Sequence, residues 1–146
     1  MRAVVQRVSE ASVTVDGKVT GRIRNGLLVL LAIHREDTDE QLRWMADKCR
    51  KLRIFEDDQG KMNRSVEDIN GGILLVSQFT LYGELKKGTR PSFINSAGPE
   101  KAEAMYDGMV SLLEESMPGM IQTGVFAAKM DVALVNDGPV TVIVER

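Results

Sequence analysis

Histidine and cysteine, on which many catalytic and metal sites depend, each occur only once in this sequence, as His34 and Cys49. The chain therefore has no internal disulfide and no clustered Cys/His metal site. A Ser/His/Asp or Cys/His catalytic pair would have to use His34. That residue lies between an apolar run and the polar stretch REDTDE, where a strand gives way to a surface loop, so we interpret it as a bystander. Any enzyme activity must then depend on hydroxyls, amides, main-chain groups or the substrate itself, and we expect no metal and no cofactor.

A long apolar run is also missing. The longest, residues 27–33, is far short of the roughly 20 residues that span a bilayer, and it is typical of a buried strand. The opening stretch MRAVVQRVSEASVTV alternates charged and apolar side chains and lacks the pattern of a secretory signal. We therefore expect a cytoplasmic protein with no membrane partner.

Charge of one sign does not dominate, because the net charge is −2. The chain thus has no global basic field that would attract nucleic acid. One local basic cluster, residues 50–53, lies at a predicted helix end, where cations suit the helix dipole. A second consists of Lys86, Lys87 and Arg90 around Gly88, in a loop after a predicted strand. This loop is either simply exposed or a place where a phosphate backbone binds.

Length and composition indicate one globular domain over residues 1–146, since 43% of the residues are hydrophobic and 27% charged. The order of elements is strands, helix, strands, helix, strands, which favours a single α+β domain. Its sheet is expected to be largely antiparallel and barrel-like, with two main helices. The predicted strands are 2–8, a hairpin of 12–15 and 18–23 around Asp16-Gly17, 27–33, 73–83, and closing strands in 121–137 and 139–146. One predicted helix follows the capping box of Thr38 and Gln41, and the other runs from Pro99 to Ser116.

The tetrapeptide SQFT lies where an apolar strand becomes polar. In a regular strand Ser77 and Phe79 would face one way and Gln78 and Thr80 the other. The glutamine and threonine side chains would then orient a water or a carbonyl, and neighbouring main-chain N–H groups would stabilise an oxyanion. On its own the tetrapeptide is more typical of a sheet edge with a polar outer face.

The segment NDGPVT begins what otherwise reads as a buried strand. Gly138 has no side chain and Pro139 has no N–H, so the segment presents bare main chain. From composition alone it is a β-turn that enters the last strand.

Six separated blocks together resemble the D-aminoacyl-tRNA deacylases, the D-tyrosyl-tRNA deacylase family, from Met1 to near the C-terminus. In chain order they are MRAVVQRVSEASVTVDG, LRIFEDDQGKMN, SQFTLYG, KKGTRPSF, TGVFAAKM and VNDGPVT. The resemblance implies an editing enzyme that hydrolyses the ester between a D-amino acid, or misloaded glycine, and the 3′-terminal adenosine of tRNA. It also implies a homodimer with two sites at the subunit interface.

The resemblance assigns roles residue by residue. It implies that Gly138-Pro139, with a cis peptide bond, reaches from the partner chain into the pocket and excludes the L side chain. Arg7 would brace that segment, and Lys86, Lys87 and Arg90 are possible tRNA contacts. Two further groups complete the site: pocket residues Ser77, Gln78, Phe79 and Thr80, and Phe126 and Met130 near the terminal adenosine.

No histidine is needed if the reaction is substrate-assisted, with the 2′-hydroxyl of the adenosine helping to activate water. In that mechanism main-chain N–H groups of Phe79 and Thr80 bind the oxyanion, Gln78 is an orienter, and nothing deprotonates the Thr80 hydroxyl. The chain departs from the family's usual GVFGADM at Ala127 and Lys129, which leaves the shape of the adenosine pocket open.

Two alternatives remain at this stage. One is a non-catalytic module that binds the tRNA acceptor end. The other is a related deacylase for a different mischarged aminoacyl-tRNA, although Gly138-Pro139 resembles the D-specific pattern.

Overall fold

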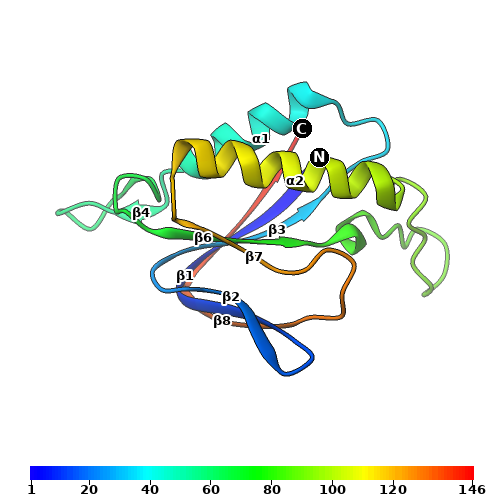
Figure 1. Cartoon of the computed structure of the whole chain (residues 1–146). Helices are drawn as coiled ribbons and strands as arrows, with labels where there is room; N and C mark the ends of the chain where they lie inside the picture. The colour runs from blue at the N-terminus through cyan, green and yellow to red at the C-terminus, as the bar shows by residue number, and fades with distance from the viewer.

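The computed structural model describes residues 1–146, which form a curled sheet with two long helices packed side by side on one face (Figure 1). This arrangement confirms the predicted α+β fold with a barrel-like sheet. The elements in chain order are β1 (Arg2–Val15), β2 (Lys18–Ile23), β3 (Gly26–Ala32), α1 (Asp39–Lys51), β4 (Phe55–Glu56), β5 (Met62–Arg64), β6 (Gly72–Ser77), the 3₁₀ helix η1 (Phe79–Tyr82), α2 (Pro99–Ser116), β7 (Ile121–Thr123) and β8 (Asp131–Glu145).

Strand β1 is the strand with the most partners in the sheet, since it pairs with three others. Its first half pairs with β3, its second half with β2, and its other edge with β8, all antiparallel. We predicted a break in this strand after residue 8, but it runs unbroken from Arg2 to Val15. Two parallel pairs, β3 with β6 and β6 with β7, extend the largely antiparallel sheet. Parallel neighbours need a long crossover connection, and each of the two crossovers here contains one of the long helices.

The curl of the sheet brings β2 close to β7. Gly21 permits this approach, because a Cβ atom there would lie 2.4 Å from the Thr123 carbonyl oxygen. The curl encloses a small core that includes Val8, Val13 and Leu74, while a larger core fills the space between the sheet and the helices. The nearly closed sheet thus has an apolar interior, and its face under the helices is apolar as well.

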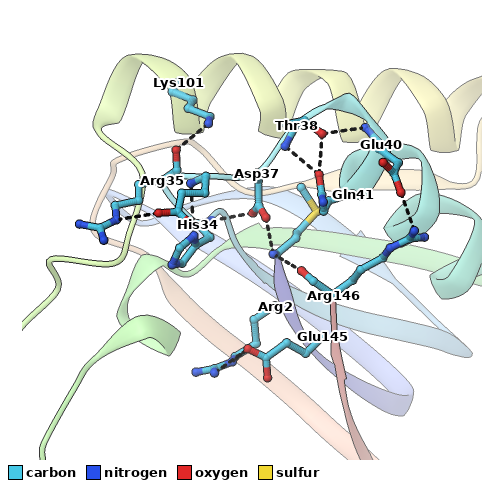
Figure 2. Close-up of polar contacts among 12 residues, drawn as sticks. Arg2, His34, Arg35, Asp37, Thr38, Glu40, Gln41, Lys101, Glu145 and Arg146 are labelled. Carbon is cyan, nitrogen blue, oxygen red and sulfur yellow. Dashed lines mark hydrogen bonds and ion pairs between the residues drawn. The ribbon is translucent and has the colours of Figure 1, made fainter.

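Helix α1 starts as the sequence predicted. The Thr38 hydroxyl accepts from the Glu40 N–H (3.3 Å), and the Gln41 side chain accepts from the Thr38 N–H (2.9 Å), which completes the capping box (Figure 2). Cys49 is fully buried on the apolar face of this helix, and burial raises the pKa of its thiol to about 12. The thiol therefore stays protonated and is a packing group. No helix in the structure is both long and apolar enough to cross a membrane.

The loop after β3 is built around Asp37 (Figure 2). Its carboxylate, 5% exposed, accepts from the Met1 ammonium (2.6 Å) and from the His34 N–H (2.6 Å). The His34 ring accepts from the Glu36 N–H at Nδ1 and packs edge-on against Tyr82. His34 thus has local contacts in a loop and does not line the cavity described below.

The prediction of a strand over 73–83 is wrong beyond Ser77. The Gln78 N–H donates to the Leu31 carbonyl (2.7 Å), and the chain then turns into η1, where the Leu81 N–H bonds to the Gln78 carbonyl. The alternation predicted for SQFT therefore does not exist. The predicted strand over 121–137 is also broken: 124–130 is a turn, and β8 begins at Asp131 and runs through Gly138-Pro139 to Glu145.

Candidate functional site

A cavity of about 560 Å³ opens where the ends of β3 and β6 meet the start of α2. This volume is in the range of small-molecule sites. Most of the wall is apolar, with polar groups at the end of β6. The lining residues include Ser77, Gln78, Phe79, Phe93, Phe126, Ala127, Ala128 and Met130.

The end of β6 supplies the polar edge of the cavity. Phe79 is 54% exposed and packs edge-on against Phe93, with ring centroids 5.1 Å apart. Gln78 Nε2 donates to Thr80 Oγ1 (2.5 Å), so these two side chains do meet, although in a turn and not in a strand. Thr80 lies beside the cavity and does not line it. No carboxylate or imidazole hydrogen-bonds to its hydroxyl, so the structure offers this group no base.

The start of η1 has free main-chain donors. Residues at the start of a helix have no intrahelical acceptor for their N–H groups. The N–H groups of Phe79 and Thr80 are in this position, and neither donates to another backbone or side-chain acceptor. Two adjacent N–H groups beside a cavity are suited to an oxyanion.

Phe126 and Met130 form another part of the cavity wall, from the turn between β7 and β8. Tyr106 of α2 supports this wall: its ring lies 5.9 Å from that of Phe126, and its hydroxyl donates to the Leu75 carbonyl (2.8 Å). Burial raises the pKa of Tyr106 to about 12, so the hydroxyl remains a donor. The spacing of Tyr106 in the sequence is that of an apolar helix face, so no sequence signal marks its contact with this wall.

Ala127 also lines the cavity, and its backbone is in the left-handed region with φ +59°. This conformation costs an L-residue about 1–2 kcal/mol, whereas glycine adopts it freely. The Ala127 methyl group therefore narrows the cavity at a cost in stability.

We predict that Ala127→Gly raises the free energy of unfolding by about 1 kcal/mol, because the left-handed backbone is no longer strained. The midpoint of urea denaturation, monitored by the fluorescence of Trp44, measures this change. The matched control is Ala128→Gly, at a neighbouring cavity residue whose φ is not positive. The control should lose stability; a loss in both variants would contradict the assigned strain.

The Gly138-Pro139 segment forms a bulge in β8. Val8 pairs with Asn136 and Gln6 with Thr141, so only Arg7 of β1 faces residues 137–140. Gly138 has φ +121°, and its peptide bond to Pro139 is cis. With residues 137–140 outside the pairing of β1 and β8, the regular ladder is interrupted at this segment.

Arg7 braces this bulge from a buried position, 5% exposed. Its Nε atom contacts the carbonyl oxygen of Asp137 (3.2 Å) and the carboxylate of the same residue (3.1 Å). Its Nη1 atom donates to the Ile54 carbonyl (2.7 Å). The bulge is thus fixed to both β1 and the chain after α1.

One chain does not bring the two predicted halves of the site together. Ser77, Gln78 and Phe79 line the cavity, while Gly138 and Pro139 do not. Strand β8 pairs only with β1, so its other edge is free. A free strand edge can be completed by a second chain.

The predicted basic contacts, Lys86, Lys87 and Arg90, are exposed in the loop after η1 and do not line the cavity. Only Lys86 makes an ion pair, 3.3 Å from Glu84. The loop leads to Phe93 in the cavity wall. No three His, Cys, Asp or Glu side chains are grouped as metal ligands.

Residues 4–145 match the model of the family described as D-Tyr-tRNA(Tyr) deacylase. The chain belongs to this family. A relative from Chloroherpeton thalassium, named D-aminoacyl-tRNA deacylase, is 55% identical over 99% of this chain and 95% of its own length. One of the same name from Thermotoga petrophila is 56% identical over 99% of this chain and 97% of its own length. The family consists of hydrolases that act on the aminoacyl ester bond.

Solved structures agree with the family's fold. One named c-Myc DNA Unwinding Element Binding Protein is 44% identical, with a TM-score of 0.96 over 100% of this chain and 99% of the other. Another, described as a probable eukaryotic D-amino acid tRNA deacylase, has a TM-score of 0.82 over 98% and 97% of the two chains. At 21% identity this second structure supports the fold alone.

Proposed function

We propose that the chain, as one domain of residues 1–146, hydrolyses D-aminoacyl-tRNA, and glycine misloaded on tRNA, at the ester to the 3′-terminal adenosine. Membership of the deacylase family supports this reaction class. The observation that carries the site assignment is the cavity itself, with free N–H groups of Phe79 and Thr80 beside it. We place the activity in the cytoplasm, where tRNA is charged.

The proposed mechanism is substrate-assisted and uses no metal. Phe126 and Met130 hold the terminal adenosine, and its 2′-hydroxyl helps a water attack the ester carbonyl. The N–H groups of Phe79 and Thr80 stabilise the oxyanion, and Gln78 orients the reacting groups. Ser77 completes the polar edge of the cavity. A substrate-assisted mechanism suits a site that has no histidine and no carboxylate in hydrogen-bonding contact with Thr80.

We further propose that the enzyme is a homodimer in which Gly138-Pro139 of one chain completes the cavity of the other. Three observations support this arrangement: the bulge is absent from its own chain's cavity, the β8 edge is free, and Ile143 on that strand is 67% exposed. Bare main chain at Gly138 would accept from the substrate's α-ammonium and leave no space for an L side chain. The completed cavity would accept D-amino acids and glycine.

The function is tested by hydrolysis of matched D-tyrosyl-tRNA and L-tyrosyl-tRNA with purified protein. We expect loss of the D ester alone. No hydrolysis of either ester would indicate a non-catalytic module that binds the acceptor end. Loss of an L ester at the same rate would indicate a related deacylase for another mischarged tRNA.

Thr80→Ala is predicted to keep measurable deacylase activity, because the Thr80 hydroxyl is not the nucleophile and its N–H remains. We expect kcat to fall by about tenfold or less, since Gln78 then has no hydroxyl to hold its amide in place. The measurement is single-turnover hydrolysis of D-tyrosyl-tRNA. Activity as low as that without enzyme would show that the hydroxyl takes part in bond making.

The basic loop is predicted to contact tRNA phosphates. The variant Lys86→Ala/Lys87→Ala/Arg90→Ala should bind tRNA more weakly, with a salt dependence lowered by about 0.9 in log–log slope for each phosphate that the loop no longer neutralises. Titration of tRNA at several salt concentrations measures both effects.

The control for this loop removes three other exposed cations, in Lys18→Ala/Arg22→Ala/Lys61→Ala. This control changes the net charge by the same amount, so it measures the effect of the overall charge on tRNA binding. An unchanged slope in the loop variant, or an equal change in both variants, would contradict a direct contact.

A further inference from the structure

Arg2, at the start of β1, contacts the 3₁₀ helix η1 at two successive residues. Its Nη1 atom donates to the Leu81 carbonyl (2.7 Å), and its guanidinium lies 4.9 Å from the centroid of the Tyr82 ring. Glu145 of β8 holds the same guanidinium through Nη2 (2.7 Å) and Nε (3.1 Å) (Figure 2). Arg2 therefore ties η1 to the two strands that carry the ends of the chain.

Helix η1 needs such a support. It has four residues, and 3₁₀ hydrogen bonds have poorer geometry than those of an α-helix. A hydrogen bond from a cation is about twice as strong as a neutral one. The Arg2 side chain is 33% exposed, so its bond to Leu81 is partly shielded from water. Tyr82 also packs against the His34 ring at 5.2 Å, so η1 has an aromatic contact beside its charged contact with Arg2.

The geometry points to Arg2 as a positioning residue for the deacylase reaction. By holding Leu81 and Tyr82 it orients η1, and with it the N–H groups of Phe79 and Thr80 at the start of that helix. Arg2 itself does not line the cavity, so it acts through η1. This inference rests on the proposed function, because it assigns the residue a role in that reaction.

Arg2→Met is the decisive variant, since it keeps the aliphatic stem and removes the donors and the charge. We expect kcat for D-tyrosyl-tRNA to fall by about 10- to 100-fold, because a small displacement of oxyanion donors has effects of that size. KM should stay within about twofold, since the cavity wall is unchanged. Arg2→Lys, which keeps the charge near Tyr82 and one donor for Leu81, should recover part of kcat.

Arg146→Met is the matched control. Arg146 also forms an ion pair, 2.6 Å to Glu40, and lies over an aromatic ring, 5.3 Å from that of Trp44. Its side chain is 39% exposed, close to the value for Arg2. It has no contact with η1, so kcat should not change.

Glu145, the ion-pair partner of Arg2, provides a second test if Arg2→Met does not fold. Glu145 is 51% exposed, and Glu145→Leu releases the Arg2 guanidinium without burying a charge. Glu145→Leu should also lower kcat, whereas Glu40→Leu, which removes the ion-pair partner of Arg146, should not. The double variant Arg2→Met/Glu145→Leu should be no slower than Arg2→Met alone, because both act through one contact.

The outcomes separate this inference from the function on which it rests. Wild-type protein that does not hydrolyse D-tyrosyl-tRNA defeats the proposed function. Active wild type with an unchanged kcat in Arg2→Met, or in Glu145→Leu if the first variant does not fold, overturns the role of Arg2. An equal loss of kcat in Arg146→Met, or an effect on KM alone, also overturns it.

Discussion

Gly138→Ala should lower kcat/KM for D-tyrosyl-tRNA by about 100-fold, the effect of displacing a substrate-positioning group by about 1 Å. The backbone at φ +121° is one that L side chains rarely adopt. A Cβ atom there would lie 2.8 Å from Val140 Cγ2 and 3.0 Å from Arg7 Nη2. Valine is stiff, and Arg7 is held by its hydrogen bonds, so the bulge itself must move.

The control for Gly138→Ala is Gly17→Ala in the β1–β2 hairpin. Gly17 also has a positive φ, +76°, but a Cβ atom there would meet nothing within 4 Å. This variant should lose about 1 kcal/mol of stability from backbone strain and keep its kcat/KM. A normal kcat/KM in Gly138→Ala, or an equal fall in Gly17→Ala, would contradict a specific role for the bulge.

Arg7→Met should lower the free energy of unfolding by about 2–3 kcal/mol, because the carbonyls of Asp137 and Ile54 are left without their charged donor. The bulge also loses its brace, so activity should fall with stability. The midpoint and slope of urea denaturation measure the first effect, and single-turnover hydrolysis the second.

Arg64→Met provides the comparison for Arg7→Met. Arg64 pairs with Asp58 at 2.9 Å, but its side chain is 42% exposed and that of Asp58 is 90% exposed. An exposed pair of this kind contributes at most about 1 kcal/mol. If Arg7→Met unfolds at the same urea concentration as Arg64→Met, Arg7 does not have the bracing role assigned to it.

Local signals in the sequence predicted local structure well. The capping box at Thr38 and the turn at Asp16-Gly17 are confirmed, because short-range hydrogen bonds and backbone preference decide them. The end of β6 was missed, since SQFTLYG has the composition of a strand. The strand ends there because, after the last bond to β3, from the Gln78 N–H to the Leu31 carbonyl, the chain turns into η1. The parallel pairing of β6 with β3 likewise depends on contacts that no local pattern reveals.

The candidate site was only partly predictable for the same reason. The resemblance named Ser77, Gln78, Phe79, Phe126 and Met130, and the structure places all five around one cavity. Their catalytic roles remain predictions. Arg2 had no sequence signal, because its partner is the carbonyl of a residue that lies 79 positions away in the chain.

We propose above that each active site is assembled from two chains. Two variants test it: Gln78→Ala/Phe79→Ala, which damages the cavity edge, and Gly138→Ala, which damages the bulge. Each is expected to have little activity as a homodimer. Co-expressed with different tags and purified as a mixed dimer, they form one site with both defects and one with neither.

The measurement is hydrolysis of D-tyrosyl-tRNA by the mixed dimer beside each parent and the wild type. We expect recovery to about half of wild-type activity, since one of two symmetric sites is intact. A mixed dimer as inactive as its parents, or a protein that is monomeric at assay concentration, would contradict a site shared between subunits.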